Sequence, residues 1–417
     1  MFDMAEEAHL VDRIAALERA KSAAAAEQAV LTARLDTTRR AREAAAGIPA
    51  ARRGKGLSGE IALARRDSPN QGGRHLGLAR ALVHEMPHTL AALRAGALSE
   101  WRATLIVRES ACLDVTDRTI LDARMCADLE SLDGKGDQRI TADAKAVAYE
   151  LDPHAVVDRA VRAEAERSVW VRPAPDAMTY VTALLPMTQG VAVYGALRRE
   201  ADTCGDGRTR GQVMADTLVE RVTGRPAAVP VPIAVEAVIT DETLLGGDQT
   251  PARVPGYGPI PAAIACQLVD RAATDARSKA TLLYRHPSSG NLIAMESRAR
   301  TFPKGLTRFT AVRDDTCRTP YCDAPIRHTD HAHPHARGGP TTAVNGLGDR
   351  EACNYTKEAP GWVVTTTLEH GRHAAEFTTP TGARHHSQAP PLPGRTTHHR
   401  SDVEIAFADH LAWHDAA

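Results

Sequence analysis

The sequence predicts an α+β protein, in which a mainly helical N-terminal domain with a few strands precedes a small C-terminal domain. Apolar residues recur at helical spacing over much of residues 1–300, whereas residues 317–362 concentrate three cysteines, several histidines and a Gly-Gly-Pro turn. The 417 residues exceed one typical domain, and a hydrophobic content of 43% is sufficient for a sizeable core. We divide the chain into residues 1–46, 47–300, 301–362 and 363–417.

Residues 1–46 are predicted to form one long helix. Their apolar side chains follow a short heptad seam, which Lys21 and Gln28 interrupt. The seam consists of Leu10, Ile14, Leu17, Ala24, Leu31 and Leu35. Two interpretations stay open: an amphipathic helix that packs on its own domain, and a coiled coil that joins two copies in a homodimer.

Residues 47–300 begin with a basic, Gly-rich connector, Gly47–Gly59, which is able to touch DNA phosphate but is more simply a solvated linker. Beyond it, Ser99, Thr116 and Thr141 are predicted N-caps of helices. We expect further helices at 189–201, 211–222, 261–272 and 303–315, strands at 168–173 and 229–240, and a hairpin at 281–297.

After residue 362 we expect two strands joined at Glu369–Arg372, an irregular Pro- and His-rich segment at 385–400, and a closing helix at 401–413. The net charge is −1, so any affinity for DNA must come from local patches. The sequence contains no apolar run of membrane-spanning length and no signal-peptide pattern at its N-terminus. The four cysteines before residue 300 show no disulfide framework, so we expect a cytoplasmic protein. Because an apolar run of spanning length is missing from the sequence, we expect no membrane partner.

The residues that carry chemistry lie between Asp330 and Asn354. Hydrolysis of a phosphodiester needs a base for the water and a cation for the developing charge. A neutral imidazole titrates near working pH, which makes His331 the natural base. Oxygen atoms of Asp330 and Asn354 suit Mg²⁺ or Mn²⁺, and two protein ligands are enough for Mg²⁺. Asn345 is placed to hold the intervening loop through its backbone.

The stretch HTDHAHPHARGGPTTAVNG, followed by ACNYTKEAPGW, resembles the HNH nuclease family, whose fold is a ββα-metal finger. The resemblance implies that His331 is the general base, that Asn345 is the loop asparagine, and that Asp330 and Asn354 hold the catalytic metal. The long uncharacterised N-terminal domain of actinobacterial HNH proteins is similar to this chain at EIALARRDSP, EMPHTLAALRAG, RTRGQVMADTLVERVTG and GYGPIP. We interpret His333 and His335 as loop or phosphate-contacting residues, since one base is sufficient.

The cysteines predict part of a structural zinc site, formed by Cys317, Cys322 and Cys353. The HNH family often supplies a fourth cysteine just before the helix, where this chain has Arg350, and a guanidinium cannot bind a metal. Asp349 or His328 could complete the site, or zinc is absent; the sequence leaves both open.

These observations predict a divalent-metal-dependent endonuclease (a phosphodiester hydrolase) that acts on DNA, most simply on double-stranded DNA. The alternative is a catalytically silent DNA-binding protein of mobile-element origin, because the lost cysteine is consistent with erosion. A nuclease that acts on RNA, or on a strand that a partner presents, stays open as a third alternative.

Overall fold

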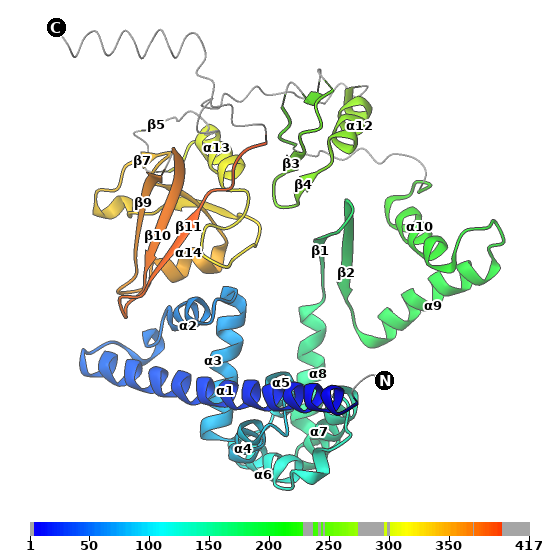
Figure 1. The fold of residues 1–417 in the computed structure, drawn as a ribbon, viewed down its shortest axis with the longest axis vertical. Helices are drawn as coiled ribbons and strands as arrows, with labels where there is room; N and C mark the ends of the chain where they lie inside the picture. The colour runs from blue at the N-terminus through cyan, green and yellow to red at the C-terminus, as the bar shows by residue number, and fades with distance from the viewer. Residues whose placement is uncertain are drawn as a thin grey trace. The chain divides into compact units, whose positions relative to one another are not determined.

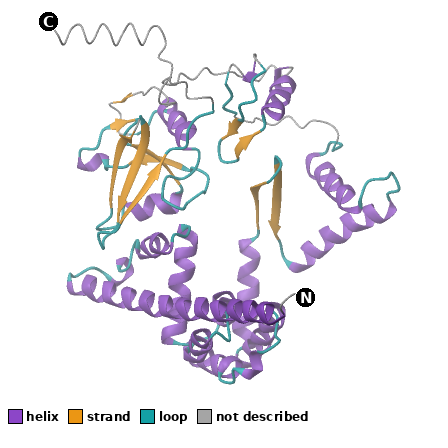
Figure 2. Cartoon of the chain, in the orientation of Figure 1, coloured by secondary structure: helices purple, strands orange, loops and turns teal. Residues whose placement is uncertain are grey.

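A computed structural model describes residues 4–227, 237–240, 243–244, 247–273, 296–297, 301–369 and 371–393 of the chain. The chain divides into two units, Met1–Arg159 with Arg285–Pro391, and Ala160–Tyr284 with Leu392–Ala417 (Figure 1). Helices predominate and the sheets are small and antiparallel, so the α+β class is confirmed (Figure 2). Within the described ranges, no helix is both long enough and apolar enough to cross a membrane.

The first unit begins with a helical part. Its helices are α1 (Met4–Ala45), α2 (Leu57–Arg65), α3 (Pro69–His84), α4 (Pro87–Ala95), α5 (Glu100–Ser110), α6 (Val115–Cys126), α7 (Asp137–Leu151) and, at the unit boundary, α8 (Pro153–Ala163). Leu98, Ile106, Leu121 and Ile140 are fully buried where α4 to α7 pack together. Proline begins α3, α4 and α8, where its missing N–H costs no helical hydrogen bond.

Helix α1 presents two different faces. Ala26, Ala29 and Ala33 are buried against α3 and α4, because small side chains allow the helices to approach closely. Of the predicted seam, Leu10 and Ile14 are exposed by 55% and 66%, so these residues do not pack on the chain's own helices. The helix therefore packs on its own domain through a stripe of alanines that we did not predict, and it leaves the first part of the heptad seam exposed.

Of the three predicted N-caps, Ser99 is confirmed, since its side chain accepts a hydrogen bond from the Arg102 N–H. The prediction for Thr116 is wrong, because Asp114 caps α6 with its carboxylate. The prediction for Thr141 is also wrong, since this residue lies inside α7 and its hydroxyl donates to the Asp137 carbonyl.

The C-terminal part of the first unit is built from short elements around a separate core. They are β5 (Glu296–Ser297), α13 (Lys304–Asp314), β6 (His328–His331), β7 (Thr341–Thr342), β8 (Gly346–Asp349), α14 (Glu351–Lys357), β9 (Val363–Glu369), β10 (Arg372–Thr378) and β11 (Arg384–Gln388). Strand β6 pairs with β8, β5 pairs with β7, and β9, β10 and β11 form one sheet in the order β11-β10-β9. Leu347, Val364, Ala375 and Phe377 fill the core between the β6–β8 hairpin and this sheet.

Strand β11 corrects the prediction of an irregular segment from residue 385. It pairs with β10, and its carbonyl at Ser387 accepts a hydrogen bond from Arg318 Nη2 at 2.8 Å. The strand lacks an apolar alternation because it lies at the edge of the sheet, so its sequence carries little strand signal.

Helix α13 is tied into this core by its last two residues. Arg313 Nη2 donates to the Gly346 carbonyl at 2.7 Å, and Asp314, only 1% exposed, accepts from the Gly348 N–H at 2.8 Å. The two side chains also pair with each other. These contacts hold α13 against β8, the strand that leads into α14.

Helix α2 contacts the C-terminal part of the same unit. Leu63 packs with Ala359 and Trp362 in one buried cluster. Glu60 is buried between Arg39, whose Nη2 is 2.8 Å from its carboxylate, and the Thr381 N–H, which donates at 3.2 Å. A Cβ added at Gly59 would lie 2.5 Å from Thr356 Cγ2, so only glycine permits this approach of α2 to the end of α14.

The second unit contains β1 (Ser168–Ala174), β2 (Met178–Leu184), α9 (Met187–Thr203), α10 (Arg210–Thr223), β3 (Ala252–Val254), β4 (Gly258–Ile260) and α12 (Ala262–Ala273). Strands β1 and β2 form an antiparallel hairpin, of which only the first strand was predicted. Most of the strand predicted at 229–240 and of the hairpin predicted at 281–297, and all of the helix predicted at 401–413, lie outside the described residues.

Candidate functional site

The pair Asp330 and His331 lies at the end of strand β6. His331 is the last residue of the strand, and its Nδ1 is 3.5 Å from Asp330 Oδ1. The imidazole is buried at 6% exposure, with its Nε2 2.9 Å from Thr341 Oγ1 and its ring centroid 4.6 Å from that of Phe302. Burial lowers the pKa of His331 below its usual value, although Asp330 opposes this shift, so the ring is neutral at neutral pH.

Asn345 lies just before β8 and joins both sides of the loop. Its Nδ2 donates to the carbonyls of His333 and Pro340 at 3.0 and 2.8 Å, and its Oδ1 accepts from the His333 N–H at 2.9 Å. A Cβ added at Gly339 would lie 1.8 Å from the His333 carbonyl oxygen, so the loop can close only over glycine. The loop that follows His331 is therefore held by three hydrogen bonds from one amide.

Helix α14 contacts the hairpin through the side chain of Lys357. Lys357 Nζ is 2.6 Å from Asp330 Oδ2 and 3.8 Å from Asp349 Oδ2, and its side chain is 3% exposed. Burial alone would raise the pKa of Asp330, but the hydrogen bond and charge of Lys357 lower it on balance. Asn354, one turn earlier on α14, has an inaccessible Oδ1 for which the described residues provide no hydrogen-bond donor.

The three predicted cysteines meet at one buried point. The Sγ atoms of Cys317, Cys322 and Cys353 lie within 4.8 Å of one another, and those of Cys322 and Cys353 are 3.6 Å apart. Hydrogen bonds from the other two thiols lower the pKa of Cys322 to about 3, whereas that of Cys353 is raised, so the cluster favours one thiolate with two thiols. Such a cluster can bind a soft metal such as zinc.

The surroundings of the cysteines bear on the fourth ligand. Among the described residues, neither Asp349 nor His328 joins the group of ligand atoms formed by the three sulfurs. Asp349 is fully buried, neither of its carboxylate oxygens has a hydrogen-bond donor in the described chain, and burial raises its pKa well above the usual range. Arg350 is the N-cap residue of α14, and its backbone N–H donates to Cys317.

Lys357 and Thr341 are the site residues that sequence reasoning missed. Each contacts one member of the Asp330–His331 pair, but neither has a distinctive spacing in the sequence. The signal for Lys357 was its position three residues after Asn354, which places both side chains on one face of a helix. His333 and His335 are exposed, and the His335 ring centroid is 5.5 Å from that of His331.

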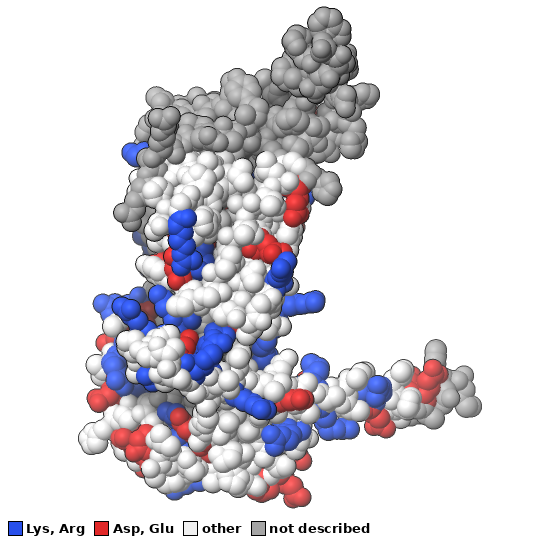
Figure 3. Space-filling view, turned by 90° about the vertical axis from the view of Figure 1, so that its left-hand side faces the viewer, with Lys and Arg blue, Asp and Glu red and all other residues white. Residues whose placement is uncertain are grey.

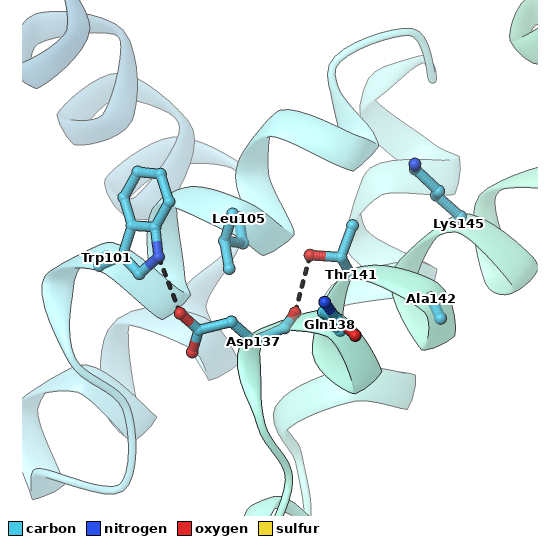
Figure 4. Close-up of a pocket in the computed structure, with 7 residues that line it drawn as sticks. All are labelled: Trp101, Leu105, Asp137, Gln138, Thr141, Ala142 and Lys145. Atoms are coloured by element: carbon cyan, nitrogen blue, oxygen red, sulfur yellow. Dashed lines mark hydrogen bonds between the residues drawn. The ribbon is translucent and has the colours of Figure 1, made fainter. Parts of the chain in front are cut away.

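A pocket of about 340 Å³ lies between α5 and α7 in the helical part (Figure 4). Its carboxylate, Asp137, accepts hydrogen bonds from Trp101 Nε1 and Arg102 Nε, both at 3.0 Å. The pocket contains none of the residues predicted to carry chemistry, and its one acid is already neutralised by a cation. We therefore locate the candidate site at the β6–β8 hairpin and α14.

The fold and the site define an α+β protein in which a helical part is joined to a small β-hairpin-and-helix unit with a buried three-cysteine cluster. Residues 12–314 match the family described as a domain of unknown function, DUF222, and the chain belongs to this family. No curated protein and no solved structure matches the chain. The predicted similarity to a long uncharacterised N-terminal domain is thus confirmed.

Proposed function

We propose that the protein is a divalent-metal-dependent DNA endonuclease of the HNH type, with the β6–β8 hairpin and α14 as its ββα-metal finger. The observation that carries the proposal is the arrangement of one buried imidazole beside one carboxylate, with an amide-held loop next to them. His331 and Asp330 adjoin at 3.5 Å, and Asn345 closes the loop that begins after His331. This combination provides a base, a metal ligand and a fixed backbone for phosphodiester hydrolysis.

His331 is the general base of the proposed reaction. We assign the ring proton of the neutral imidazole to Nε2, which then donates to Thr341 Oγ1. The free lone pair is then on Nδ1, the nitrogen that faces Asp330. Burial lowers the pKa of His331 and keeps the imidazole neutral, so it can take a proton from an attacking water at neutral pH.

The residues present fit a hard divalent cation. Asp330 offers a carboxylate, and Asn354 offers an oxygen that the described residues leave without a donor although it is inaccessible to solvent. These two residues would hold Mg²⁺ or Mn²⁺, which when bound supplies positive charge to the phosphate and the leaving oxygen. Asn345 shapes the loop and holds the backbone beside His331 in place.

One observation favours the alternative of a catalytically silent DNA-binding protein. The Lys357 ammonium already occupies Asp330 Oδ2 at 2.6 Å, so a metal must compete with a buried cation for this oxygen. The second oxygen of Asp330 is not engaged by Lys357, and Mg²⁺ commonly binds a carboxylate through one oxygen. The endonuclease therefore stays the better supported proposal.

The test is nicking of supercoiled plasmid by the purified protein with Mg²⁺, Mn²⁺ or EDTA. His331→Ala should lower the rate by about 10²–10⁴-fold, as expected for loss of a general base, while DNA binding is retained. His84→Ala is the matched control, because it removes an exposed imidazole at the end of α3, outside the proposed site, and should keep the activity. Equal activity of the His331 variant, or nicking undiminished in EDTA, would exclude the assignment. Binding without nicking in every metal would support the silent protein.

A further inference from the structure

The charge of the chain is unevenly distributed. Residues 34–80 contain eleven Lys and Arg against four Asp and Glu, a net charge of +7, whereas the whole chain carries −1. The remainder of the chain is therefore at −8. This basic segment covers the end of α1, the connector to α2, α2 itself and most of α3, so its charge is carried by neighbouring elements of one unit.

The acids of this segment are engaged by partners. Asp36 accepts hydrogen bonds from Arg40 and Arg80, and Glu60 pairs with Arg39 inside the unit. Glu43 accepts the Gly54 N–H, and Asp67 contacts His75. The negative charges therefore neutralise particular neighbours, and the excess of positive charge is left to the exposed side chains.

Three of these exposed cations lie at the end of α1 and in the connector that follows it. The Gly54 N–H donates to Glu43 at 2.6 Å, and Arg53 Nε donates to the Ile48 carbonyl at 2.7 Å, so the connector folds back on the helix that precedes it. The exposed cations next to these contacts in the chain are Arg42, Arg52 and Lys55, which we call the connector surface. All three side chains are exposed, and within the described residues none of them forms an ion pair or a side-chain hydrogen bond.

The connector meets the segment that follows the proposed finger at Gly56, next to Lys55. A Cβ added at Gly56, the residue after Lys55, would lie 2.7 Å from Trp362 Nε1 and 2.8 Å from Ala359 Cβ. Both residues follow α14, the helix that carries Asn354. Figure 3 shows Lys and Arg gathered in a band at mid-height on the face that lies to the left in Figure 1, with few acids among them.

We propose that the connector surface binds the phosphate backbone of the DNA duplex on which the finger acts, so that the helical part contributes substrate contacts to the site. This inference rests on the proposed nuclease function. Arginine forms paired hydrogen bonds with phosphate, and a free lysine adds a point charge, which together suit a polyanion without sequence readout. Under this proposal the connector touches DNA phosphate, which is the less simple of the two interpretations that the sequence offers for residues 47–59.

The experiment measures binding of a labelled DNA duplex of about 30 base pairs to the full-length protein by fluorescence anisotropy in EDTA, at several salt concentrations. The binding constant falls as salt rises, and each lost phosphate contact makes the negative slope of log K against log salt less steep by about 0.9. The triple variant Arg42→Gln/Arg52→Gln/Lys55→Gln should therefore make this slope less steep by about 2 to 3. It should also raise the Kd at least about tenfold. Its unfolding temperature should be unchanged, since all three side chains are exposed.

The matched control is Arg124→Gln/Arg139→Gln/Lys145→Gln, which removes the same charge from exposed positions of α6 and α7. It should retain the Kd and the salt slope of the wild type. If both triple variants weaken DNA binding equally, only net charge matters and the inference is overturned. An unchanged Kd in the connector variant, or tighter binding of an RNA duplex than of the DNA duplex, would also overturn it. Plasmid nicking is scored separately. If the wild-type protein never nicks DNA but the connector variant loses DNA binding, the nuclease proposal is refuted and the proposed phosphate-binding surface is retained.

Discussion

Replacement of Arg350 by cysteine should turn the three-cysteine cluster into a complete zinc site. The backbone N–H of Arg350 already donates to Cys317, and Cys353 lies three residues later in the first turn of α14, so a thiol at position 350 begins next to the cluster. The arginine charge that acts on Cys322 is removed at the same time. We expect weak zinc occupancy in the wild-type protein, because a closed structural site needs four ligands.

The magnitude follows from the missing ligand. Loss of even an outer partner of a metal ligand costs about 10–100-fold in affinity, so a full ligand is worth at least this factor. At saturating zinc, a 10–100-fold tighter site adds about 1.4–2.7 kcal/mol to the free energy of unfolding. For a folding unit of the size of the first unit, this raises the unfolding temperature by roughly 3–10 °C.

The assay is zinc analysis together with thermal unfolding of the wild type and Arg350→Cys, each with and without chelator. Arg350→Ser is the matched control, because it removes the charge and has nearly the shape of cysteine but provides no thiolate. Only the cysteine variant should gain stability that the chelator removes. One tightly held zinc in the wild type, not strengthened by the substitution, would show that another residue supplies the fourth ligand, and our reasoning would be refuted.

Two further predictions concern the ends of the first unit. Replacement of Leu10, Ile14 and Leu17 by Gln should convert a dimer to a monomer in light scattering. The unfolding temperature should not change, because these side chains are exposed by 48–66%. A wild-type protein that is monomeric at high concentration would refute the coiled coil. Burial lowers the pKa of His373 to about 4. As the pH falls below about 6.5, the unfolded state therefore binds a proton at this residue that the folded state does not. The free energy of unfolding should fall by roughly 3 kcal/mol between pH 6.5 and pH 4. His373→Gln should flatten this dependence and the exposed control His386→Gln should not; equal slopes in chemical unfolding would contradict the assignment.

The residues of the candidate site could be found from the sequence because they lie close together in it. Asp330, His331 and Asn345 lie within a short segment whose turn residues are recognisable, and the three cysteines bracket that segment. The ion pair between Lys357 and Asp330 was not predictable, since it depends on how α14 crosses β6. A helix has several faces, and sequence spacing alone does not say which face meets the hairpin.

In the first unit the helices at 1–46 and 303–315 were predictable from the sequence, but the contacts between distant elements were not. Trp362 meets α2 about 300 residues away, and only the glycines at 56 and 59 hint that a bulky group approaches there. The stripe of alanines on α1 was missed, because alanine carries a weak hydrophobic signal beside the leucines of the heptad seam.

The tie between α13 and strand β8 has a consequence for how this chain can be divided. The family match ends at residue 314, yet Arg313 and Asp314 are buried in the core that contains Leu347. A cut at that boundary would leave a charged pair without its backbone partners on one fragment, and the Ala343 and Gly346 carbonyls and the Gly348 N–H without their side-chain partners on the other. Each buried group that stays unpaired costs about 1–3 kcal/mol. A fragment that is cut at the end of the family match is therefore expected to be less stable than the intact first unit.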